Sequence, residues 1–142
     1  MVHNIVEINS RKKVFTLDEA RKILPLVHRI TREARQKVQA CIQTLNGLPD
    51  KNCDKGRKLE AEINEAVGHW QAKLEKLGVE PKGLWVADFN SGSGYFCWRF
   101  PEEAIEFWHN YSDGFSKRTL IAQTIKHLHN ANVKASVIDQ NT

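Results

Sequence analysis

The sequence predicts an α+β fold, in which a long antiparallel helical hairpin packs on a small two- or three-stranded antiparallel β-sheet. Residues 16–78 repeat apolar side chains at helical spacing, whereas residues 84–109 are rich in aromatic and β-branched side chains around a glycine-containing turn. A chain of 142 residues, 41% hydrophobic and 27% charged, suits one ordinary globular domain. We therefore expect a single domain over residues 1–142.

The first helix is predicted over residues 16–46. Thr16 and Glu19 form a capping box, in which the threonine hydroxyl accepts from the third helical amide and the glutamate accepts from the cap amide. Pro25 removes one helical hydrogen bond, so we expect a kink there rather than a break, and Gly47 is expected to end the helix. Apolar and small side chains recur at alternating steps of three and four, the period of a coiled coil. They are Leu17, Ala20, Leu24, Val27, Thr31, Ala34, Val38, Cys41 and Leu45.

The second helix is predicted over residues 54–78, with Gly78 as its cap. A connection of about ten residues makes the two helices antiparallel neighbours. The coiled-coil period extends further than one partner helix and a small sheet require. The sequence therefore leaves room for a homodimer through the helical hairpin.

The β segment is predicted over residues 84–109. Two strands, residues 84–89 and 95–100, flank a loop of five residues. If all five loop residues are unpaired, Trp85 lies opposite Arg99 in a cation–π geometry, whereas a slip of one residue would exchange the two faces.

The rest of the chain has weaker patterns. Residues 104–109 are interpreted as a third strand, with a short helix as the alternative. Residues 112–142 are expected to form a loop and then a weak C-terminal helix, near residues 120–130, with a tail.

The charge, hydropathy and cysteine content of the chain limit the partners and the cellular location that can be expected. The net charge is +4, and residues 1–78 carry the basic excess, with 15 Lys and Arg against 10 Asp and Glu. This excess hints at an anionic partner, but acidic side chains on the second helix could neutralise it and no nucleic-acid-binding signature occurs, so nucleic acid is an unlikely partner. No membrane-length apolar run and no signal-peptide pattern occurs, so we expect a cytoplasmic protein without membrane association.

Cys41 and Cys97 are interpreted as small buried hydrophobic residues, and Cys53 as a loop thiol.

Several short motifs match a known family in order and spacing. Between Phe15 and about Leu120, the chain resembles the bacterial family catalogued as domain of unknown function 2203. The resemblance implies a helical hairpin plus a small β unit in a bacterial cytoplasmic protein, and it implies no activity. Where the family has Val-Asp-Phe this chain has Val-Ala-Asp-Phe, with one extra residue. The resemblance therefore leaves open which face of the sheet the Asp88 side chain projects from. The matching motifs are Phe15-Thr16-Leu17-Asp18-Glu19-Ala20, Leu24-Pro25-Leu26, Gly83-Leu84, Asp88-Phe89, Cys97-Trp98-Arg99, Trp108-His109 and Gly114-Phe115 with Arg118.

Polar side chains gather among aromatic ones in the β segment, as they do in many small-ligand pockets. Paired arginines suit a carboxylate or phosphate ligand, because each guanidinium can donate two parallel hydrogen bonds, and His109 is a candidate acid or base. The structural alternative is that these groups close a polar rim around the core. The candidate ligand-binding residues are Asp88, Trp98, Arg99, Trp108, His109 and Arg118.

No catalytic residue, cofactor or metal site is predicted. No nucleophile–base motif or phosphate-binding loop occurs, and the pairs His127/His129 and His28/His69 bring no further ligands at metal spacing. The favoured function is a non-catalytic binding or protein-interaction module. The alternative is a small anionic-ligand-binding protein or enzyme that uses the neighbourhood of Arg99, His109 and Arg118.

Overall fold

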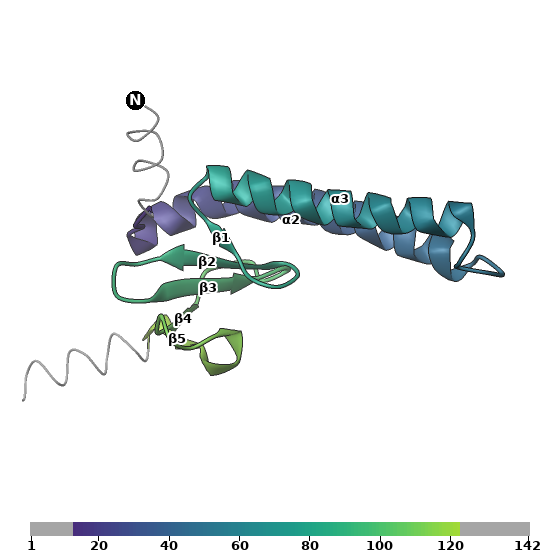
Figure 1. Ribbon diagram of the computed structural model, residues 1–142. Helices are drawn as coiled ribbons and strands as arrows, with labels where there is room; N and C mark the ends of the chain where they lie inside the picture. The colour runs from purple at the N-terminus through teal and green to yellow at the C-terminus, as the bar shows by residue number, and fades with distance from the viewer. Residues whose placement is uncertain (1–12, 123–142) are drawn as a thin grey trace, which may run out of the picture.

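The computed structural model describes residues 13–122 (Figure 1). Two long helices lie side by side on one face of a five-stranded antiparallel sheet, so the α+β class is confirmed. The expectation of two or three strands is wrong, because two-residue strands at both edges extend the sheet to five. The elements are α2 (Leu17–Asn46), α3 (Asp54–Lys76), β1 (Glu80–Pro81), β2 (Val86–Asn90), β3 (Tyr95–Arg99), β4 (Phe107–His109) and β5 (Thr119–Leu120).

Helix α2 begins at the predicted capping box. The Thr16 hydroxyl accepts from the Glu19 amide at 3.1 Å, and the Thr16 amide donates to the Glu19 carboxylate at 3.0 Å. The helix continues through Pro25 as one element. The predicted start and end of this helix are therefore confirmed to within one residue.

Helix α3 begins at Asp54, directly after Cys53, which was expected to be a loop thiol. Its Sγ accepts from the Gly56 amide at 3.4 Å and so acts as the N-cap. At the other end the chain reverses through Gly78, whose φ of +80° favours glycine, and Val79 donates to the Leu74 carbonyl at 3.0 Å. This reversal leads the chain directly into β1 beneath the helix.

The register of the central hairpin differs from the one considered above. Asn90 pairs with Tyr95 and Val86 with Arg99, so four residues rather than five form the turn. The Asn90 side chain accepts from the Gly92 amide at 2.9 Å, which fixes this tighter turn. Trp85 consequently does not oppose Arg99. All five residues of β2 pair regularly, so there is no bulge at Asp88.

The predicted third strand is confirmed as β4, which is shorter than expected. The predicted loop after it contains a 3₁₀ turn over Phe115–Lys117 and is followed by β5. Most of the predicted C-terminal helix lies outside the described residues. In the described range, no helix is long and apolar enough to cross a membrane.

The main core lies between the hairpin and one face of the sheet. Ala87, Phe89 and Trp98 project from the sheet and are fully buried against Val27 and other helical side chains. Also in this core, the Trp70 ring nitrogen donates to the Thr31 hydroxyl at 2.8 Å. The loop end of the hairpin projects well beyond the sheet (Figure 1).

We predict that Leu24→Ala lowers the free energy of unfolding by about 2–4 kcal/mol and Val38→Ala by an amount toward the lower end of that range. Both side chains are at least nine-tenths buried, at 6% and 5% exposure. Urea unfolding followed by circular dichroism measures the change, with the exposed Ile42→Ala as the control. Equal losses for Ile42→Ala and Leu24→Ala would contradict this assignment of the core.

The homodimer remains a proposal. The projecting end of the hairpin has no sheet beneath it, and Ile42 is 38% exposed there. We expect sedimentation equilibrium at micromolar concentration to give twice the chain mass of 16.3 kDa. A single species at the monomer mass throughout the concentration range would remove the proposal.

Candidate functional site

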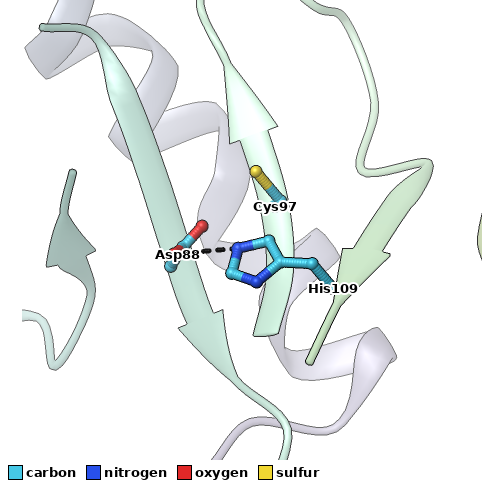
Figure 2. A group of neighbouring side chains, drawn as sticks. All are labelled: Asp88, Cys97 and His109. Carbon is cyan, nitrogen blue, oxygen red and sulfur yellow. Dashed lines mark hydrogen bonds and ion pairs between the residues drawn. The ribbon is translucent and has the colours of Figure 1, made fainter. Parts of the chain in front are cut away.

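The two faces of the sheet differ in chemistry because side chains alternate along each strand. Ala87, Phe89 and Trp98 face the helices, so Asp88 and Cys97 project from the opposite face, which we call the outer face. Asp88 lies directly across from Cys97 in the β2–β3 pair. His109 reaches the same face from β4, where it pairs with Tyr95. Three strands therefore bring a carboxylate, a thiol and an imidazole together (Figure 2).

All three side chains are buried, although α2 and α3 both pack on the other face of the sheet. Asp88 and His109 are 3% exposed and Cys97 is fully buried. The segment after β4 turns back over the outer face, where the Tyr111 hydroxyl donates to Asn90 Oδ1 at 2.6 Å. Burial of this polar set needs electrostatic compensation, because an unpaired charge in the interior is costly.

The hydrogen bonds of His109 define its protonation at one ring nitrogen. Nδ1 lies 2.8 Å from the carbonyl oxygen of Asn110, and since a carbonyl only accepts, Nδ1 carries a proton. Nε2 lies 3.1 Å from Oδ2 of Asp88. If the imidazole is neutral, the Nε2 lone pair faces a carboxylate oxygen. The contact between them therefore requires a proton, on Nε2 or on the carboxyl group of Asp88, or a bound cation between the two atoms.

Cys97 and the second Asp88 oxygen complete the cluster. One donor atom from each of Asp88, Cys97 and His109 lies within 4.8 Å of the other two. Oδ1 of Asp88 is buried and has no hydrogen-bond partner. Burial raises the pKa of Asp88, although the nearby His109 and the Cys97 thiol oppose the shift. Burial, and then the negative charge of Asp88, raises the pKa of Cys97 to about 12.

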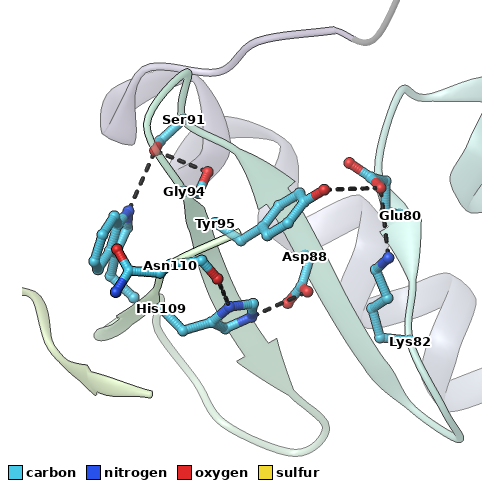
Figure 3. Close-up of polar contacts among 9 residues, drawn as sticks. Glu80, Lys82, Asp88, Ser91, Gly94, Tyr95, His109 and Asn110 are labelled. Atoms are coloured by element: carbon cyan, nitrogen blue, oxygen red, sulfur yellow. Dashed lines mark hydrogen bonds and ion pairs between the residues drawn. The ribbon is translucent and has the colours of Figure 1, made fainter. Parts of the chain in front are cut away.

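A cavity of about 430 Å³ opens beside this cluster, lined by Asp88 and His109 together with Lys82, Tyr111 and other residues. Figure 3 shows the polar contacts of Asp88 and His109 and of nearby residues of the sheet. The Tyr95 hydroxyl donates to Glu80 at 3.3 Å, and Lys82 pairs with the same carboxylate at 3.6 Å. The cavity is large enough for a small molecule.

Of the six predicted site residues, Asp88 and His109 come together at the cavity. Trp98 belongs to the core and donates to the Glu102 carbonyl at 2.7 Å. Trp108 lies on the helix side of the sheet and donates to Ser91 at 3.2 Å. These two tryptophans therefore support the fold and do not face the cavity.

The two arginines are held in structural contacts and do not line the cavity. Arg118 donates to both carboxylate oxygens of Glu102, at 2.9 and 2.7 Å. Its guanidinium also lies between the rings of Phe107 and Phe115, at 3.9 and 4.1 Å from their centroids. Arg99 is exposed and lies over Phe115 at 5.5 Å. These contacts are the ones expected if the two arginines close a polar rim around the core, which was the structural alternative to a ligand site.

Cys97 was missed as a member of the site. Its aromatic neighbours in the sequence suggested a buried hydrophobic residue, and the expected register placed it opposite Ala87. The observed register shifts the pairing by one residue and places it opposite Asp88. The polar turn residue Asn90 was the available signal, because it can begin a four-residue turn.

Comparison with known families adds one result. A family model described as an uncharacterized conserved protein, DUF2203, matches residues 13–121. The chain belongs to the DUF2203 family. The matched region includes Asp88, Cys97 and His109, so the cluster lies within the family domain. No curated protein and no solved structure matches the chain.

For this DUF2203 protein we predict that Arg118→Lys lowers the free energy of unfolding by about 1–3 kcal/mol, because lysine cannot reproduce the two-pronged bond to Glu102 or the stacking between rings. Arg99→Lys should cost under about 0.5 kcal/mol, as is usual at exposed positions. Urea unfolding measures both. A carboxylate or phosphate that stabilises the parent protein but not Arg99→Lys would contradict this assignment and favour an anion site.

Proposed function

We propose that the protein binds a divalent transition-metal ion, with zinc as the best match, through Asp88, Cys97 and His109. The observation that carries the proposal is the convergence of three buried donor groups, from three strands, within 4.8 Å of one another. The unpartnered Oδ1 of Asp88 supports it, because a buried carboxylate oxygen normally has a partner.

The donor set suits zinc in chemistry and in size. Zinc takes thiolate sulfur, imidazole nitrogen and carboxylate oxygen, at bond lengths of about 2.0–2.3 Å. Tetrahedral ligands at those lengths lie roughly 3.3–3.6 Å apart. The cluster spans 3.1 Å between Asp88 Oδ2 and His109 Nε2 and no more than 4.8 Å elsewhere. Side-chain adjustments of about 1 Å would form the coordination sphere, without a change of fold.

The second hydrogen bond of His109 also supports the proposal. A histidine that binds a metal usually donates its other ring N–H to a carbonyl or carboxylate, which fixes the ring and the tautomer. Nδ1 makes such a bond to the Asn110 carbonyl at 2.8 Å and leaves Nε2 toward the cluster. A bound cation between Nε2 and Asp88 would take the place of the proton that this contact otherwise needs.

A cysteine-nucleophile enzyme is less well supported by the same residues. A catalytic cysteine needs a lowered pKa and an adjacent base, whereas the pKa of Cys97 is raised to about 12. In addition, Nε2 of His109 is hydrogen-bonded to Asp88. Metal binding removes this difficulty, because a coordinated thiol loses its proton to the solvent.

Three protein ligands would leave one position of a tetrahedral zinc ion for water or a small ligand. Asp88 and His109 border both the cluster and the cavity of about 430 Å³, so that position would be reached from the cavity. The proposal therefore retains a binding protein as the function class. The suspected ligand site is then the metal ion and the cavity beside it, and Arg99 and Arg118 are no longer part of that site.

We expect the metal-depleted protein to bind one Co²⁺, used as a spectroscopic probe for zinc, and to show thiolate-to-cobalt charge-transfer absorption. Cys97→Ser should abolish that absorption, because serine keeps the size of cysteine but removes the sulfur donor. His109→Gln should weaken Co²⁺ binding at least about tenfold. Affinity should rise with pH, since the thiol must lose a proton.

Cys41→Ser is the matched control. Cys41 is also buried, and its thiol donates to Glu62 at 3.7 Å, on the hairpin and away from the outer face. This variant should bind Co²⁺ as the parent does. Charge-transfer absorption that persists in Cys97→Ser or is lost in Cys41→Ser would refute the assignment. A parent protein that binds no Co²⁺ or Zn²⁺ at micromolar concentration would leave a buried histidine–aspartate ion pair in place of the metal site.

A further inference from the structure

A second cavity lies on the helix side of the sheet, apart from the cluster on the outer face. Its volume is about 570 Å³, and it lies between the first half of α2 and residues 103–105. Arg21, Arg29 and Arg32 border it, and Glu103 is its single acidic residue. We call this cavity the arginine groove. Its lining has an excess of positive charge.

The partners of the arginines distinguish this groove from ordinary basic surface. In residues 13–122, four arginines have a carboxylate or ring partner: Arg35 lies over Phe100, Arg57 pairs with Asp54, Arg99 lies over Phe115 and Arg118 pairs with Glu102. Within that range, the remaining three, Arg21, Arg29 and Arg32, have no ion pair and no ring contact, and all three border the groove.

The inner wall of the groove is fixed by packing. The His28 ring lies 5.0 Å from the Phe100 ring and 5.7 Å from the Trp98 ring, between α2 and the core. Pro25 also borders the groove and has no N–H to donate to the Arg21 carbonyl one turn earlier. The groove therefore presents its guanidinium donors on a continuous helix.

The spacing of the arginines indicates the size of the ligand. Arg29 and Arg32 are three residues apart and so are neighbours on the helix surface, able to hold one anionic group together. Arg21 precedes Arg29 by eight residues, or about 12 Å along the helix. A ligand that satisfies all three carries more than one anionic group.

We propose that the arginine groove binds a small molecule with at least two phosphate groups. Guanidinium matches phosphate because its planar fork donates two parallel, charge-assisted hydrogen bonds. The volume of the groove suits a metabolite-sized ligand. This site is independent of the proposed metal site, which lies on the other face of the sheet.

Isothermal titration calorimetry of the full chain at low ionic strength tests the proposal, with inorganic phosphate and tripolyphosphate as probes. The protein is metal-depleted, because tripolyphosphate chelates divalent cations. Tripolyphosphate should bind at least about tenfold more tightly than phosphate. Arg29→Gln and Arg32→Gln should each weaken tripolyphosphate binding about tenfold or more, and Glu103→Gln should strengthen it.

Arg57→Gln is the matched control, since it removes the same charge at the start of α3, outside the groove. It should change the affinity by less than about twofold. No binding of tripolyphosphate, or equal losses in Arg57→Gln and Arg29→Gln, would overturn the proposal. A single-stranded oligonucleotide of about 12 residues that binds through Arg29 much more tightly than tripolyphosphate would also overturn it, in favour of a nucleic-acid surface.

Discussion

The register of the β2–β3 hairpin is the constraint on which the rest of the structure depends. Asn90 pairs with Tyr95. Because side chains alternate along each strand, this one pair decides which face of the sheet every other side chain of β2 and β3 projects from. A shift of one residue would place Phe89 and Trp98 on opposite faces of the sheet, so either Trp98 would turn away from the helices or Asp88 would lie against them. The core and the donor cluster are thus two results of the same pairing, one on each face of the sheet.

The outer face is unusual because polar groups are buried there although α2 and α3 both pack on the opposite face. The cover consists of the residues that follow β4, held by the bond from Tyr111 to Asn90 and by Arg118 between Phe107 and Phe115. This cover buries Asp88 and His109, apart from the side on which they border the cavity. The aromatic and arginine contacts that the sequence suggested as a binding site therefore hold the cover of the donor cluster in place.

Periodic features of the fold were predictable, and features that depend on register were not. The α2 stripe and the Thr16 capping box are local patterns, and the structure confirms both. The edge strands are only two residues long, too short for any pattern to show. Asp88 and His109 were recognised as polar groups within an aromatic segment, whereas Cys97 joins them only through cross-strand pairing, which a single sequence does not fix. The pairing of Arg118 with Glu102 could not be foreseen, because the two residues lie 16 positions apart in the sequence.

The unequal lengths of the strands have a kinetic consequence for the cluster. Asp88 and Cys97 belong to five-residue strands at the centre of the sheet, whereas His109 ends a strand of three residues whose outer neighbour has only two. Short edge elements open locally at a lower free energy than central ones. Detachment of β4 would carry the imidazole away and leave the carboxylate and thiol in place. If the cluster binds a metal ion, detachment of β4 gives that ion a further route in and out, for which global unfolding of the domain is not required.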